Sequence, residues 1–279
     1  MSYALITMIE SNENCINSQR GITFSHKRLY EDEAVLCFKS WRENGGWLKD
    51  IPIYTYCPSR NVVSETTKEE MKKYNVTYIE NFLPETDGFF SGFWNVPLCG
   101  KIFEETLSED VLIHIDLDMK LIKPLPQELV DSVLNNDYVI CGQYDDESSK
   151  SQRKIGNDWK NPLDTGFLIS NRKTKFYKFF YEALSEITKT KGDARWKEKC
   201  SDWPLYFLEE YVIDKAYNEQ NYPIRPIQKY QVGEGYAKIS TYTDEELRNV
   251  YFWHEHILHG EDYDKIREKI EFFKRTRPV

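Results

Sequence analysis

The most constraining feature of this sequence is a short apolar segment, residues 110–119, that ends in two aspartates. The run from Val111 to Ile115 is rich in β-branched residues, which is typical of a strand buried on both faces, as in a parallel sheet. Asp116 directly follows the run, and Asp118 comes two residues later. If the strand geometry continued through them, the alternation of side chains would place both carboxylates on the same side.

Two neighbouring carboxylates repel each other and cost stability unless a cation or hydrogen-bond donors lie between them. In open α/β sheets, ligands bind in the crevice outside the carboxyl ends of the strands, which is where this pair is expected. The simplest explanation is therefore a divalent metal ion that carries a phosphorylated ligand. The alternative is a solvated pair of aspartates in the turn after the strand.

The segment LIHIDLDMKLIKPLP, residues 112–126, resembles the D-x-D segment of GT-A type glycosyltransferases, which use nucleotide sugars and include the glycogenin-like families. In those enzymes the second aspartate binds Mn²⁺ or Mg²⁺, and the first contacts the metal, the donor ribose or both. The resemblance implies metal ligands at Asp116 and Asp118, with a donor contact at Asp116. It also implies an α/β fold of GT-A type, a Rossmann-like α/β/α sandwich around a mixed, mostly parallel central sheet.

The length of 279 residues permits one large α/β domain or two small ones. We expect a single domain over 1–279, with a nucleotide-sugar-binding half at 1–120 and an acceptor-binding half at 121–279. The net charge of −9 argues against a nucleic-acid partner, because phosphate-backbone binding needs a basic surface. A nucleotide ligand remains compatible with this charge, because a bound metal ion reverses the sign locally.

The six cysteines include no C-x-x-C pair and several lie in apolar runs, so we expect buried, reduced thiols. No stretch approaches the roughly 20 apolar residues of a transmembrane helix. The first ten residues lack the basic region of a signal peptide. These features predict a cytoplasmic enzyme, for which bacterial or viral glycan assembly is the suggested setting. A shortened form of a membrane-anchored enzyme is the alternative.

The order of the expected elements indicates a parallel sheet. Strands at 3–9, 51–57 and 76–79 alternate with an amphipathic helix at 28–44 and a short helix that begins at a capping box from Thr66. Such alternation implies right-handed crossovers between parallel strands.

Two groups of donor contacts follow from the GT-A resemblance alone. The end of the first strand touches the nucleotide base in that family, which makes Thr7, Met8 and Ile9 candidates; a plain core strand is the alternative. The helix before the D-x-D strand carries a basic residue that faces the donor, and Lys101 is the candidate here. A surface lysine that extends its charged end into solvent is the alternative.

The segment DTGFLISN, residues 164–171, resembles the [N/D]-x-G and apolar strand that follows the acceptor loop in glycogenin-like transferases. The resemblance implies that Asp164 hydrogen-bonds donor-sugar hydroxyls, and Gly166 would let the backbone approach a ligand closely. An Asp-initiated turn before a core strand is the alternative. The preceding residues, 143–162, are polar and aperiodic, so we expect a long loop, either a lid over the donor or a disordered surface segment.

Asp202 and Pro204 are typical of a helix start, with an N-cap and a proline in the first turn. The resemblance adds a second, compatible role for Asp202, because an acid at the start of this late helix faces the reactive carbon of the sugar or the acceptor hydroxyl.

Three of the five histidines lie within residues 252–260. GT-A enzymes commonly complete the metal shell with a late histidine in an H-x-x-G context, so His256 and His259 are the candidates. The match is imperfect, because three residues rather than two separate His256 from Gly260, and His259 directly precedes Gly260. The alternative is that no histidine binds metal.

The chain is therefore predicted to be a metal-dependent glycosyltransferase that moves a sugar from a UDP-sugar to a glycan or glycoconjugate acceptor, using Mn²⁺ or Mg²⁺. UDP-xylose, UDP-galactose and UDP-glucose are the candidate donors. If the reaction inverts configuration, Asp202 is the first candidate for the base and Asp164 the second; if it retains configuration, they orient the sugar. Two alternatives stay open: a sugar-nucleotide or glycan-binding protein of the same fold without turnover, and an Asp-based phosphotransferase, whose aspartates usually follow the first strand.

Overall fold

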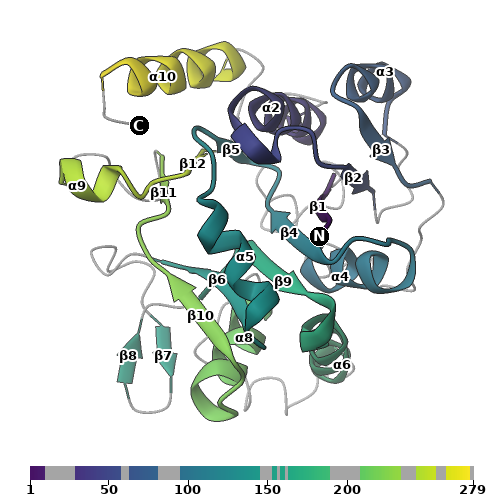
Figure 1. Ribbon diagram of the computed structural model, residues 1–279, viewed down its shortest axis with the longest axis vertical. Coiled ribbons are helices and arrows are strands. Elements are labelled where there is room, and N and C mark those ends of the chain that lie inside the picture. The colour runs from purple at the N-terminus through teal and green to yellow at the C-terminus, as the bar shows by residue number, and fades with distance from the viewer. Residues whose placement is uncertain are drawn as a thin grey trace.

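A computed structural model of the chain shows its elements around a central sheet (Figure 1). It describes residues 1–9, 29–57, 63–80, 95–144, 153–155, 158–160, 163–188, 208–233, 243–255 and 262–276.

The central sheet has seven strands in the order β10-β6-β9-β4-β1-β2-β3. Every neighbouring pair is parallel except the two that β9 makes, because β9 runs antiparallel to both β4 and β6. The expected α/β class with a mixed, mostly parallel sheet is therefore confirmed. The strand bounds are β1 Tyr3–Met8, β2 Ile53–Tyr56, β3 Val76–Tyr78, β4 Val111–Ile115, β6 Val139–Gln143, β9 Leu163–Asn171 and β10 Ile224–Ile227.

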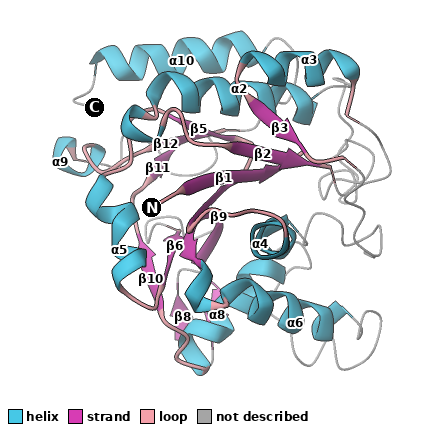
Figure 2. Cartoon of the chain, turned by 45° about the vertical axis from the view of Figure 1, so that its right-hand side comes forward, coloured by secondary structure: helices cyan, strands magenta, loops and turns pink. Residues whose placement is uncertain are grey.

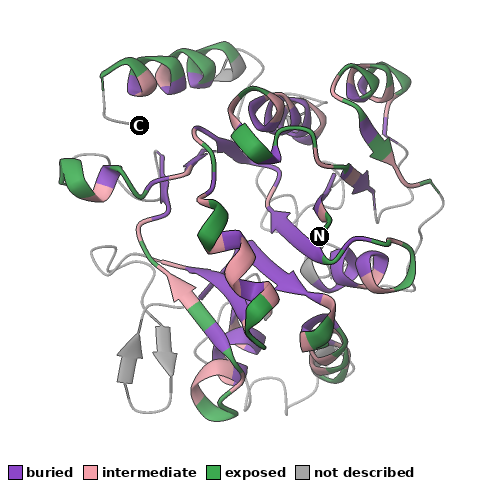
Figure 3. Cartoon of the chain, viewed as in Figure 1, coloured by how far each residue is buried: buried purple, intermediate pink, exposed green. Residues whose placement is uncertain are grey.

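Helices pack on both faces of this sheet (Figure 2). One core contains α2 (Leu29–Asn44), α3 (Glu65–Lys73) and α5 (Gln127–Asn135), and the other contains α4 (Asn95–Glu105), α6 (Phe176–Thr188) and α8 (Leu208–Glu219). The strands β4 and β9 are buried along their whole length (Figure 3). Burial on both faces is the property that the apolar run before Asp116 predicted. Two short 3₁₀ helices, Gly46–Leu48 and Arg172–Thr174, follow α2 and β9.

A small three-stranded sheet, in the order β11-β12-β5, brings the late part of the chain to the end of β4. Its strands are β5 (Met119–Leu121), β11 (Gln231–Val232) and β12 (Phe252–His254). β12 pairs antiparallel with β5, so His254 lies opposite Met119. The helix α10 (Asp262–Thr276) packs its apolar side chains against Trp253, and the short helix α9 (Asp244–Leu247) contributes Leu247 to the same cluster.

Two local expectations are corrected by the structure. The segment 143–162 contains a hairpin, β7 (Arg153–Ile155) and β8 (Asp158–Lys160), where a long loop was expected. The helix predicted from a capping box at Thr66 is capped two residues earlier, by Ser64, whose Oγ accepts a hydrogen bond from the backbone N–H of Thr67 at 3.3 Å. The hairpin was missed because each of its strands has only three residues, and the helix start was misplaced because Ser64 and Thr66 are both residue types that cap helices.

The described cysteines Cys37, Cys57, Cys99 and Cys141 are buried thiols, and none forms a disulfide with another described residue. Burial raises the pKa of Cys37 to about 12, so at neutral pH the side chain stays a thiol and is a poor nucleophile. Within the segments that the structure describes, no helix is both long and apolar enough to cross a membrane.

Candidate functional site

The two aspartates of the D-x-D segment lie in a tight turn that follows β4. The backbone N–H of Asp116 donates to the carbonyl of Gly166 at 2.9 Å, and that of Met119 donates back to the carbonyl of Asp116 at 3.0 Å. The strand therefore ends at Ile115. The alternation of side chains along a strand does not extend to Asp116 and Asp118, so the expectation that it places both carboxylates on the same side does not apply. The side chain of Asp116 is 36% exposed, whereas that of Asp118 is 9% exposed.

Asp118 faces an imidazole from the late part of the chain. Its Oδ1 lies 3.2 Å from Nε2 of His254, at the end of β12. On the other side of the ring, Nδ1 lies 2.6 Å from Oε1 of Gln231. The amide of Gln231 is oriented by its own second contact, because its Nε2 donates to Oδ2 of Asp164 at 2.9 Å. With the amide oxygen facing the ring, Nδ1 of His254 carries a proton and donates it.

This tautomer leaves Nε2 of His254 directed at a carboxylate oxygen. Nε2 and this oxygen are both acceptors and lie 3.2 Å apart, so a positive charge between them would be favourable, either a proton on Nε2 or a metal ion. Carboxylate oxygen and neutral imidazole nitrogen are both ligands for divalent transition metals. A metal-binding histidine almost always donates its other N–H to an acceptor, as this one does to Gln231. Asp118 and His254 therefore fit a divalent metal ion.

The pair supplies only part of a coordination shell. Over the described residues, no group of three or more His, Cys, Asp or Glu side chains gathers closely enough to hold an ion. Ions such as Mg²⁺ are commonly held by one or two carboxylates together with water and substrate phosphates. Two protein ligands at the end of a central strand are thus suited to an ion that arrives with a phosphorylated ligand.

Asp164, at the start of β9, is 2% exposed and lies beside this pair. Its Oδ2 accepts hydrogen bonds from the Tyr230 hydroxyl at 2.5 Å and from Gln231, and its Oδ1 accepts one from the backbone N–H of Gly166 at 2.9 Å. Burial raises the pKa of this carboxyl, although His254 and the hydrogen bond from Tyr230 oppose the shift. Both oxygens already serve as acceptors.

Two glycines provide the space for the site. A Cβ at Gly166 would lie 2.9 Å from Oδ2 of Asp116 and 3.1 Å from Oδ1 of Asp164, closer than side chains normally approach. A Cβ at Gly233, just after β11, would lie 1.8 Å from the backbone oxygen of His254. The close approach of the three segments that carry the acids and the imidazole therefore depends on residues without a side chain.

The first turn of α8 adds a further buried acid that sequence reasoning missed. Glu210 is 8% exposed, and its pKa lies well above the ordinary 4.5 because of burial and the nearby charges of Asp164, Asp116 and Asp214. Asp214 accepts a hydrogen bond from the backbone N–H of Leu163 at 3.0 Å, which attaches this helix to the start of β9. The only sequence signal is a pair of acids one helical turn apart on an otherwise apolar face.

Replacing Glu210 by glutamine should stabilise the protein increasingly as the pH rises. The folded state holds the Glu210 proton to a higher pH than the unfolded state, so the free energy of unfolding falls as the pH rises from about 4.5 through the folded pKa. Glutamine does not ionise, so the variant does not lose this stability. Each pKa unit by which the folded state exceeds the unfolded state corresponds to about 1.4 kcal/mol in the free energy of unfolding. Urea unfolding at pH 4, 6 and 8 in EDTA would measure the effect.

A matched control is Glu219→Gln at the exposed opposite end of the same helix, which should change the free energy of unfolding equally little at each pH. An advantage of Glu210→Gln that is constant over this range would contradict the assignment of a raised pKa.

The other predicted donor contacts lie at the end of β1, which is the parallel neighbour of β4, and on α4. Thr7, Met8 and Ile9 are 0%, 3% and 1% exposed, in agreement with a core strand, so contact with a ligand would have to come from their backbone. The ammonium of Lys101 lies 4.0 Å from a glutamate one turn along α4 and 5.5 Å from the ring centroid of Tyr181 on α6. These contacts fit the surface-lysine alternative.

Three of the predicted site residues, Asp202, His256 and His259, lie outside the described residues. The histidine that the structure brings to Asp118 is His254, the first of the same cluster. Gln231 also escaped sequence reasoning, because no motif marks it and only the pairing of β11 with β12 places it beside the ring.

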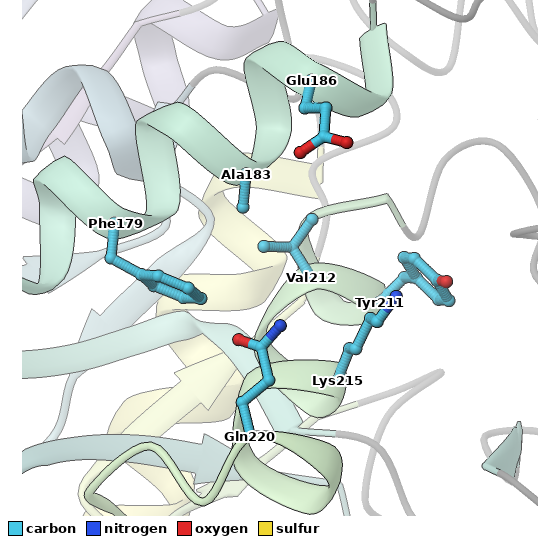
Figure 4. A pocket seen from close by; sticks show the side chains of 7 residues that line it. All are labelled: Phe179, Ala183, Glu186, Tyr211, Val212, Lys215 and Gln220. Atoms are coloured by element: carbon cyan, nitrogen blue, oxygen red, sulfur yellow. The ribbon is translucent and has the colours of Figure 1, made fainter.

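A pocket of about 100 Å³ lies between α6 and α8 (Figure 4). Its lining combines aromatic, apolar and charged side chains from both helices and the residue that follows α8, namely Phe179, Ala183, Glu186, Tyr211, Val212, Lys215 and Gln220. It shares no residue with the D-x-D turn or with β12. The metal-binding chemistry of the candidate site therefore rests on the Asp118–His254 pair rather than on this pocket.

Comparison of the chain with models of known protein families and with curated proteins gives no match.

Proposed function

We propose that the protein is a metal-dependent glycosyltransferase of GT-A type, which transfers a sugar from a UDP-sugar to a hydroxyl of a glycan or glycoconjugate. The observation that carries this proposal is the 3.2 Å approach of His254 Nε2 to Asp118 Oδ1, directly beyond the end of β4. In open, mostly parallel sheets this edge is where ligands bind. The resemblance of the D-x-D segment and of the strand at 164–171 to glycosyltransferase motifs adds the substrate class.

Asp118 and His254 would hold Mn²⁺ or Mg²⁺, with the remaining positions left to the pyrophosphate and water. A divalent ion held there would act as a Lewis acid and would neutralise the negative charge that develops on the departing nucleoside diphosphate. The carboxylate of Asp116 is the more exposed of the two and would turn toward the ion or toward a ribose hydroxyl. Gly166 has no side chain, so the backbone leaves space where the sugar would lie.

Asp164 is better suited to orienting a donor sugar than to removing a proton. A general base needs an oxygen that can accept the proton of the acceptor hydroxyl, and it must be reached by that hydroxyl. Asp164 is 2% exposed and already accepts three hydrogen bonds. For an inverting reaction, Asp202 therefore remains our proposed base, and a retaining reaction would need no such base.

The test is the thermal stability of the protein with UDP, UDP-glucose, UDP-galactose and UDP-xylose, each with Mn²⁺ or with EDTA. A ligand that binds only the native state at 100 times its Kd adds about 2.7 kcal/mol, which corresponds to roughly 5 °C or more in Tm for a chain of this size. We expect a shift that requires both UDP and the metal, with ADP and GDP as controls. No shift with any uridine nucleotide would contradict the proposal.

Measurements of turnover distinguish a transferase from a sugar-nucleotide-binding protein and from a phosphotransferase. Release of UDP from a UDP-sugar, with or without acceptor, is expected of a transferase. Metal-dependent binding of UDP with no turnover under any acceptor would indicate a sugar-nucleotide-binding protein. Release of inorganic phosphate from simple phosphate esters would instead favour the Asp-based phosphotransferase.

A further inference from the structure

A continuous chain of hydrogen bonds links the acid on β9 to the imidazole on β12. The backbone N–H of Gly166 donates to Asp164, Asp164 accepts from the amide of Gln231, and the carbonyl of that amide accepts from His254. Beyond the ring lies Asp118. Among the described residues, Gln231 thus joins the acid proposed to orient the donor sugar to the pair proposed to hold the metal.

Gln231 is 5% exposed and is fixed in both position and direction. Its backbone lies in β11, paired with Phe252 two residues before His254. Its amide has one donor end and one acceptor end, and the carboxylate of Asp164 takes the donor end at 2.9 Å. The acceptor end must then face His254. A hydrocarbon side chain of the same length would occupy the space without fixing the ring.

We infer that Gln231 is a positioning residue that makes the site prefer Mn²⁺ to Mg²⁺. This inference rests on the proposed metal site. Gln231 holds His254 with the proton on Nδ1, so the ring presents Nε2 as a nitrogen ligand next to the oxygen of Asp118. Mg²⁺ takes oxygen ligands in a strict octahedron, whereas Mn²⁺ also accepts imidazole nitrogen. Selectivity between the two ions therefore depends on Nε2 remaining available.

Without the amide, the imidazole loses the acceptor that fixes its tautomer. The proton can then reside on Nε2 and be donated to Asp118, and this internal hydrogen bond competes with the metal ion for both ligands. Removal of a residue that supports a metal-bound histidine commonly costs 10- to 100-fold in metal affinity. The affinity for Mg²⁺ depends less on the nitrogen ligand, so it should fall less than the affinity for Mn²⁺.

The experiment is a titration of the full chain with MnCl₂, in which electron paramagnetic resonance counts the free ion, followed by competition with MgCl₂. Both are done with and without UDP. For Gln231→Met we expect the Mn²⁺ affinity to fall about 10- to 100-fold and the Mn²⁺/Mg²⁺ affinity ratio to fall with it. The matched control is Gln228→Met, since the amide of Gln228 donates to Gln143 at the surface, at 3.0 Å. This control should leave both affinities unchanged.

A second variant, His254→Asp, replaces the nitrogen ligand by oxygen and should shift the preference toward Mg²⁺ even if Gln231→Met does not fold. An unchanged ratio in a folded Gln231→Met, or an equal loss of both ions, would overturn the inference and leave the metal site standing. An unchanged ratio in His254→Asp would overturn it as well. If the unaltered protein binds no Mn²⁺ with or without UDP, the metal site of the proposed function itself fails.

Discussion

Replacing Asp118 by asparagine should abolish Mn²⁺-dependent transfer while leaving the fold intact. The amide keeps the shape of the side chain but removes the negative charge that would hold the ion. Loss of one group that stabilises a developing charge typically lowers kcat by about 10²–10³. The rate of UDP release from a UDP-sugar, measured as a function of Mn²⁺ concentration, would show this loss.

Folding should survive the change because the new amide can donate to Nε2 of His254, which lies 3.2 Å from Oδ1 in the unaltered protein. One hydrogen bond contributes about 1 kcal/mol, so we expect Tm to stay within about 4 °C of the original. Asp110→Asn is the matched control, because Asp110 lies at the opposite end of the same strand, where it accepts from the backbone N–H of Ser2 at 2.9 Å. Transfer that is undiminished in Asp118→Asn would remove the metal assignment.

The largest effect on stability is expected from Lys120→Met. Lys120 is fully buried, and its ammonium donates to the backbone carbonyls of Asp118 at 2.6 Å and Glu255 at 2.9 Å. Methionine has a similar length but no donor, so both carbonyls would lose a partner in the interior. A buried group without a partner costs about 1–3 kcal/mol, part of which is offset because a charge no longer has to be buried.

We therefore expect the free energy of unfolding to fall by about 2–4 kcal/mol in Lys120→Met, measured by urea denaturation. Lys123→Met is the matched control: Lys123 is only half-buried, and its ammonium contacts the carbonyl of Arg248 at the surface, so we expect a loss below about 1 kcal/mol. Mn²⁺ affinity should fall together with stability, because Lys120 connects the turn that carries Asp118 to the residue after His254. A Lys120→Met protein as stable as the original would show that the two hydrogen bonds only compensate for burying the charge.

The parts of the fold that follow from local pattern were predictable. The alternation of apolar runs and amphipathic helices over the first 80 residues indicated parallel strands, and β1, β2 and β3 are parallel neighbours. The apolar run before Asp116 indicated burial on both faces, and β4 has it. These predictions depend on periodicity within single elements, which a sequence displays directly.

The parts that depend on pairing between distant segments were not predictable in the same way. The strand β9 resembles the parallel strands of the sheet in composition, and nothing in its residues indicates that it runs antiparallel to both of its neighbours, β4 and β6. The Asp pair was placed on an extended strand, although the hydrogen bond from the Met119 N–H to the carbonyl of Asp116 closes a turn at that point. His254 comes to Asp118 because β12 pairs with β5, and a two-residue strand such as β11 carries too little pattern to place Gln231.

The short sheet of β5, β11 and β12 also has a consequence for how the protein is made. Asp118 emerges from the ribosome more than a hundred residues before His254, and until β12 pairs with β5 the nascent chain holds a carboxylate without its imidazole. Contacts between residues so far apart in sequence form late, because closing the intervening chain costs entropy first. Ion binding at this pair, as we propose it, should therefore arise only with the completed fold. A fragment released before residue 252 would carry the D-x-D sequence but not His254, the proposed partner of Asp118.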